Sequence, residues 1–168
     1  MKARWILVTG LALLAAGCGG STTPSTATPT SSAATPTPTP TAESTAQVAQ
    51  AYLSAAAAVD AAYTTWHSDL VAANGDVLQL KSQASAYAAV LTTFDSAVQG
   101  LGATGQAAGD IATLVADDNT VIADLNALSS LTASGESAWD TKALSDGLNA
   151  AAQGNVVRAD LGLPAAAA

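Results

Sequence analysis

Cys18 and His67 are the only cysteine and the only histidine among the 168 residues, and they limit the chemistry that the chain can carry. One histidine cannot build a His-rich zinc site, and no Glu-x-x-His pair is present for a di-iron centre. The glycines between residues 100 and 109 lack the spacing and the lysine of a phosphate-binding loop. His67 falls at the edge of an apolar helix face, which is typical of a half-exposed structural residue; only a structure can test whether a serine and an aspartate join it. We therefore predict a protein that is not an enzyme, with no catalytic residue, metal or cofactor.

Asp118 is the polar residue that most clearly interrupts an apolar pattern. At about 100° per residue, it falls near the centre of the apolar stripe of residues 111–128. A carboxylate there must find partners or shift its pKa upward. We expect Tyr63 and Tyr87 at the same level on neighbouring helices, and predict that one or both hydroxyls bond to Asp118. The cluster would then fix the register of the helices, or it would be an interior site for a small solute or cation. A rotated helix would instead leave Asp118 exposed.

Asp110, Asp117 and Asp124 repeat every seven residues and border the same stripe. They could form an acidic face for a divalent cation or a basic partner, or a solvated flank that keeps the protein soluble. Residues seven apart lie about 10 Å apart along a helix axis, so two of these carboxylates could not hold one calcium ion.

The hydrophobic periodicity predicts an all-α domain. Apolar residues recur in steps of three and four over four segments, which are residues 44–73, 77–101, about 109–133 and 136–161. Ser44 and Gln47 fit a capping box at the first helix, and Asn74-Gly75 is a turn signal after it. Short connections favour an antiparallel up-down-up-down four-helix bundle. An intermolecular coiled coil is the alternative, which the short Asn74-Gly75 turn disfavours.

The fourth helix has the weakest pattern. Gly147 and Gly154 lower its intrinsic stability, so it must depend on packing. The residues that we expect to supply this packing are Leu144, Leu148, Ala152 and Val156.

Residues 1–17 have the features of an export signal. Lys2 and Arg4 precede an apolar run, and small residues follow it at positions 15–17. The run is too short to cross roughly 30 Å of hydrocarbon as a helix. The ending Ala-Ala-Gly-Cys resembles the lipobox of bacterial lipoproteins, although Ala15 stands where leucine is commonest. The resemblance implies that Cys18 is lipidated and becomes the mature N-terminus, on the extracytoplasmic face of the cell membrane.

A linker is expected at residues 18–43. Residues 21–42 contain only nine Thr, five Pro, four Ser and four Ala, so they cannot bury a core and should be disordered. Fully extended, this stretch would reach roughly 70 Å. After residue 17, three basic residues stand against thirteen acidic ones, a net charge of −10. This charge excludes nucleic acid as a partner and leaves the lipid on Cys18 as the contact with the membrane.

The ending Arg158-Ala-Asp-Leu-Gly-Leu-Pro resembles the C-terminal signature of small, uncharacterised actinobacterial lipoproteins, which also have a lipobox, a Thr/Ser/Pro tether and an alanine-rich helical domain. The resemblance implies a location and a fold class, and brings no activity. We expect the helical domain to span residues 44–163, with a tail at 164–168. Antiparallel pairing predicts that Arg158 clamps this end of the domain by pairing with Asp110. The function predicted is interaction with an envelope protein or an envelope-structural role, and binding of a small solute or cation is the alternative.

Overall fold

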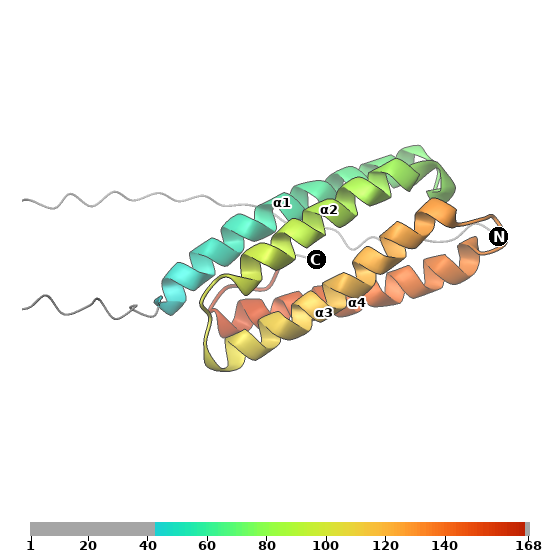
Figure 1. The fold of residues 1–168 in the computed structure, drawn as a ribbon. Helices are drawn as coiled ribbons and strands as arrows, with labels where there is room; N and C mark the ends of the chain where they lie inside the picture. Colours follow the sequence, from blue (N-terminus) through green and yellow to red (C-terminus); the bar gives the residue numbers. More distant parts are fainter. Residues whose placement is uncertain (1–42, 167–168) are drawn as a thin grey trace, which may run out of the picture.

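The computed structural model describes residues 43–166. Within these residues the chain is all-helical and has no strand (Figure 1). The four α-helices are α1 (Thr45–Ala72), α2 (Lys81–Gln99), α3 (Gly105–Ala127) and α4 (Glu136–Asp160). Two short 3-10 segments flank them, η1 (Val77–Leu80) before α2 and η2 (Leu128–Ser130) after α3. The predicted all-α class is confirmed.

Local polar signals set the bounds of α1. Ser44 Oγ accepts a hydrogen bond of 3.3 Å from the backbone N–H of Gln47, whose Oε1 accepts one of 2.9 Å from the N–H of Ser44. This is the predicted capping box. After the helix, Asn74 and Gly75 have φ of 55° and 79°, a left-handed turn that these residue types tolerate. Asp76 then caps η1 by accepting a backbone N–H, so the second helical segment begins with a 3-10 turn.

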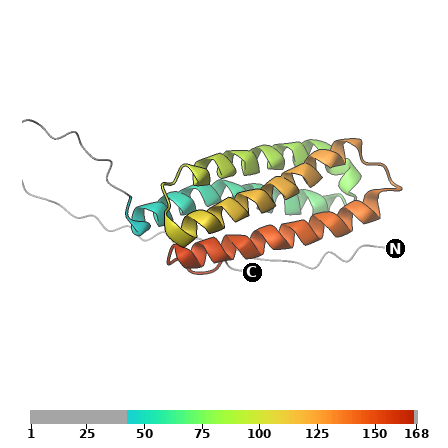
Figure 2. The same cartoon turned by 60° about the horizontal axis from the view of Figure 1, so that its bottom comes forward.

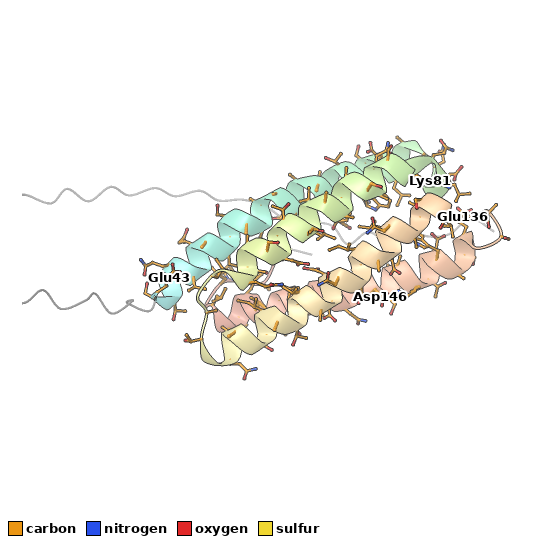
Figure 3. The ribbon with its side chains drawn as sticks, viewed as in Figure 1. Glu43, Lys81, Glu136 and Asp146 are labelled. Atoms are coloured by element: carbon orange, nitrogen blue, oxygen red, sulfur yellow. The ribbon has the colours of Figure 1, made fainter. Side chains whose placement is uncertain are left out.

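Consecutive helices pack against one another: α1 on α2, α2 on α3 and α3 on α4. Lys81, at the start of α2, donates through Nζ to the backbone oxygens of Ser129 (3.2 Å) and Leu131 (3.1 Å), just after α3. The start of α2 therefore lies beside the end of α3. Glu43 lies at one end of the helices, and Lys81 and Glu136 lie at the other (Figure 3). The four helices run side by side (Figure 2).

The hydrophobic core has two parts that follow one another along the helices. The part nearer the start of α1 includes Tyr52 and Phe94, whose rings meet edge to face at 5.9 Å. The second part includes Leu128 and Trp139. On α3, the buried Asp118 lies between residues of the two parts, and on α2 the buried Asp95 lies beside Phe94, next to the boundary. The apolar surface of both parts supplies the main driving force for folding.

Our prediction of the packing face of α4 is wrong. Leu144 and Leu148 are 41% and 49% exposed, Ala152 and Val156 are exposed too, and the buried residues of this helix lie on its other face. Those buried residues are Trp139, Ala150 and Val157. Polar residues share the buried face because they pair with α3, and this interrupts the apolar pattern by which a packing face is recognised.

The predicted signal peptide at residues 1–17, the lipidated Cys18 and the linker up to residue 42 lie outside the described residues. Of the linker and tail predictions, only Glu43 and residues 164–166 fall within them. Among the helices that the structure describes, none is long and apolar enough to cross a membrane.

Candidate functional site

Asp118 lies inside the helical domain, and the interpretation that leaves it exposed is wrong. The residue is 5% exposed and comes from the buried face of α3. Its neighbour is Asp95, which is also 5% exposed and comes from α2. The two carboxyl groups are within hydrogen-bonding reach of each other across the α2–α3 contact. The candidate site is therefore a buried pair of carboxyl groups.

No basic group neutralises this pair. Both carboxylate oxygens of Asp95 are buried, and no donor from the described residues bonds to either of them. As ionised groups, Asp95 and Asp118 are acceptors only, so neither can satisfy the other. A proton on one of them converts it into a donor, and the pair is then bonded internally. Desolvation raises the pKa of both carboxyl groups. For Asp118, burial and the charges of Asp95 and Asp117 raise the pKa to about 7.

The sequence contained a signal for Asp95 that we missed. Ala84, Ala88, Leu91, Asp95 and Val98 follow one another in steps of four and three, and all five are buried. The apolar row that we read from the sequence shares Ala84, Leu91 and Val98 with this set, but it runs through Tyr87 and Phe94 instead of Ala88 and Asp95. Asp95 interrupts an apolar row of α2 in the same way as Asp118 interrupts one of α3, and the two carboxyl groups lie next to each other.

Of the two predicted tyrosines, Tyr87 is half-buried and lies near Asp118, whereas Tyr63 is 39% exposed, so its predicted place in an interior cluster is wrong. Burial raises the pKa of the Tyr87 hydroxyl, and the charge of Asp118 adds to this effect, which places the two groups close together. The Tyr63 ring lies 6.3 Å from the ring of His67, and its hydroxyl also acts on Tyr87. A hydrogen bond from either tyrosine to Asp118 stays a prediction. Tyr52, which we did not predict, is also near, because burial and Asp118 raise its pKa to about 12.

Asp110 and Asp124 face α4 and do not form one continuous acidic surface. Gln153 of α4 donates to the backbone oxygen of Asp110 at 3.1 Å and to its carboxylate at 3.4 Å. Asp124 is buried and accepts a hydrogen bond of 2.5 Å from Lys142. The interpretation of this residue as part of a solvated flank is therefore wrong. Asp117, between them, is half-buried. The described residues contain no group of three or more His, Cys, Asp or Glu side chains arranged to hold a metal.

The predicted pair of Arg158 and Asp110 is not formed in the described part of the chain. Arg158 Nε donates instead to the backbone oxygen of Pro164 at 2.7 Å. The backbone N–H of Ala166 donates to Asn155 Oδ1 at 2.9 Å, so the C-terminal segment turns back along α4. Asp110 takes its polar contacts from Gln153 and Asp160 of α4 and from Gln106 of α3. Arg158 thus holds the tail against the helix that carries it.

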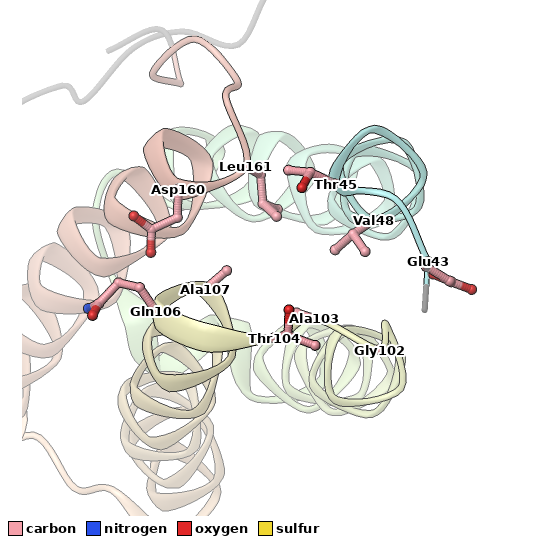
Figure 4. Close-up of a pocket in the computed structure, with 10 residues that line it drawn as sticks. All are labelled: Glu43, Thr45, Val48, Gly102, Ala103, Thr104, Gln106, Ala107, Asp160 and Leu161. Carbon is pink, nitrogen blue, oxygen red and sulfur yellow. The ribbon is translucent and has the colours of Figure 1, made fainter. Parts of the chain in front are cut away.

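Two pockets lie away from the buried pair. One, of about 260 Å³, opens where α1 begins and α4 ends, and there Gln106 and Asp160 lie on one side while Glu43 points away (Figure 4). The other, of about 340 Å³, lies between α1 and α2 and is lined mainly by alanine, with Phe94 and Val90. Neither pocket is lined by Asp95, Asp118, Tyr63 or Tyr87. The pair is therefore packed among side chains and does not open into either pocket.

No protein-family model, curated protein or solved structure matches this chain.

Proposed function

We propose that this chain is a lipoprotein, anchored through lipid on Cys18 to the extracytoplasmic face of the cell membrane, and that its helices form a non-enzymatic interaction or envelope-structural domain. The anchor rests on the lipobox-like ending at Cys18, on the short apolar run before it and on the Thr/Pro/Ser composition that follows. The resemblance to small actinobacterial lipoproteins supports the same location.

We infer that the domain is an antiparallel up-down-up-down four-helix bundle. The packing of consecutive helices supports this arrangement, as does the contact of Lys81 at the start of α2 with the chain just after α3. The ring contacts of Tyr52 with Phe94 and of Trp66 with Tyr87 support it for α1 and α2, because the earlier residue of one helix meets the later residue of the other. Such a bundle is a rigid body suited to presenting one helix face to a partner.

The observation that carries the interaction function is the outer face of α4. Leu144 and Leu148 are one turn apart on the face opposite to the buried row, and both are exposed. Single exposed leucines are ordinary, but two on one face and one turn apart form an apolar contact surface. The partner that fits is a protein with an apolar, uncharged helix or sheet face.

Site-specific crosslinking would test this function. A photoreactive amino acid at Leu148 should crosslink one protein in native membranes, and Leu144→Asp should abolish the adduct. Val71, which is 64% exposed on α1, is the matched control position and should give no adduct. Equal labelling from both positions, or none from Leu148, would contradict the proposal. Because both leucines are exposed, Leu144→Asp should leave the fold intact.

The anchor is tested separately. Cys18→Ser should move the protein from the membrane fraction to the soluble fraction, and the wild-type N-terminal peptide should carry acyl chains by mass spectrometry. A chain that stays in the membrane fraction after Cys18→Ser would contradict lipid anchoring without affecting the interaction function.

A second candidate function is binding of a small solute or cation at Asp118. The observation in its favour is the neighbouring Asp95, whose buried carboxylate oxygens accept no hydrogen bond from a described donor. A ligand that binds only the folded chain must raise its Tm. A panel of divalent cations, metabolites and wall fragments should therefore include one that raises Tm in the wild type and not in Asp118→Asn. If none does, this candidate fails.

A further inference from the structure

We propose that Asp95 and Asp118 form a proton-binding latch, in which the two carboxyl groups share one proton that holds α2 against α3 and whose release loosens this contact. The inference does not rest on the proposed function, since it concerns the interior of the domain and not its anchor or its outer face.

The geometry calls for a bound proton. Each residue is 5% exposed, and Asp95 has two oxygens that no described donor reaches. Leaving such a buried acceptor unsatisfied costs free energy, and two buried like charges in contact cost more. One proton removes one charge and supplies the missing donor. It also needs no space, which matters because neither pocket is lined by the pair.

The surrounding groups offer no other cation. The titratable groups whose charges act within this region come from all four helices, and they are Tyr52 and Asp60 of α1, Tyr87 of α2, Asp117 of α3 and Arg158 of α4. All but Arg158 are acidic, and Arg158 acts on Tyr52 and Asp60 while its Nε bonds to the tail. Lys142 is engaged by Asp124 and Asp146. No basic group is therefore available to replace the proton on the pair, and the neighbouring acidic groups favour its retention.

The sign of the pH dependence follows. Burial raises the pKa of both carboxyl groups in the folded chain above the ordinary value of 3.8, that of Asp118 to about 7. The folded chain therefore binds protons more tightly than the unfolded chain, so the stabilisation is complete in acid and is lost as the pH rises through about 7. Carboxylates in ion pairs give the opposite dependence.

Thermal unfolding of the purified full chain in detergent micelles, at pH 5 to 8.5, tests the latch. We expect the wild-type Tm to fall by at least about 5 °C over this range. Asp118→Asn and Asp95→Asn each replace one carboxyl group of the pair with an amide that stays neutral and can donate to the remaining carboxylate. Each should therefore raise Tm at pH 8.5 and weaken the dependence on pH. Asp69→Asn, which removes a half-buried carboxylate of α1, is the matched control and should leave the fall in place. The same fall in wild type and in both pair variants would overturn the proposal.

Hydrogen exchange separates a latch from a mere stability effect. At pH 8, amides of α2 and α3 near the pair should exchange faster in the wild type than in Asp118→Asn, and at pH 5 the two chains should match. Equal exchange at both pH values would overturn the loosening. If Asp118→Asn does not fold, Asp95→Asn takes its place in this comparison.

A proton count keeps the proposal testable without either pair variant. In His67→Gln with its α-amino group acetylated, neither the histidine nor the amino terminus titrates, and the native chain should take up close to one proton between pH 8.5 and pH 5.5. Uptake near zero would overturn the latch. A divalent cation that raises the wild-type Tm at pH 8.5, but not that of Asp118→Asn, would also overturn it in favour of a cation site.

Discussion

The indole Nε1 of Trp139 donates a hydrogen bond of 2.7 Å to the backbone oxygen of Asp124, inside the contact between α3 and α4. The same aspartate receives Lys142 on its side chain. One residue of α3 therefore fixes α4 through both its main chain and its carboxylate. This contact orders the end of the domain at which α4 begins.

Trp139→Phe should lower the free energy of unfolding by about 1–2 kcal/mol. The phenyl ring keeps most of the buried apolar volume, so the loss reports mainly the hydrogen bond to Asp124. Urea unfolding followed by circular dichroism measures it, because this signal does not depend on the deleted indole. A variant as stable as the wild type would show that the bond adds nothing beyond packing.

Lys142→Met should lower the free energy of unfolding, because it leaves the buried Asp124 carboxylate without its cation. Asp124→Asn in the same chain should recover part of this loss, since no buried charge then remains. Asp146→Asn removes the other carboxylate partner of Lys142, which is more exposed, and should cost less than about 1 kcal/mol. If the two single variants lose equal stability, burial of Asp124 is not the cause.

The local signals of the sequence predicted the bounds of the first and fourth helices well, whereas α3 begins at Gly105 and ends at Ala127 instead of at about 109 and 133. The capping box at Ser44 and the turn at Asn74-Gly75 each act within a few residues, so their effect is readable from the chain alone. The end of α4 is set as locally: at Gly162, φ is 68°, and the N–H of the next residue bonds to Arg158 O.

Contacts between helices were predicted less well, for two physical reasons. On α4, Lys142 and Gln153 occupy the packing face because their partners are polar residues of α3, so an apolar pattern pointed to the wrong face. On α3, the level of Asp118 relative to α2 depends on the path of residues 100–104, which separate the two helices. Counting residues back from the turn placed Asp118 level with Tyr87, and we did not consider Asp95. Burial of Asp118 itself was predictable, because it depends only on the phase of its own helix.

Gly147→Ala should raise the free energy of unfolding by about 0.5–1 kcal/mol. An added Cβ meets no atom within 4 Å there, so alanine gains helix propensity without a clash. Gly154→Ala should stabilise at least as much, because its Cβ would make ordinary van der Waals contacts with Tyr52 and Leu114 at 3.8 and 4.0 Å. Gly162→Ala is the opposite control and should destabilise, since φ is 68°. Thermal melts of the three variants should follow this order, and a destabilised Gly147→Ala would contradict it.

Arg158→Ala and Asp110→Ala should have additive effects on stability. The structure gives Arg158 the backbone oxygen of Pro164 and gives Asp110 the side chain of Gln153, so the two share no contact. A double-mutant cycle should therefore return a coupling energy below about 0.5 kcal/mol. Arg158→Ala alone should release the C-terminal tail, so that carboxypeptidase removes residues 164–168 faster than in the wild type, while Asp110→Ala leaves the rate unchanged. A coupling energy above about 1 kcal/mol would restore the pair predicted from helix pairing and would contradict the role of Arg158 as the contact that holds the tail.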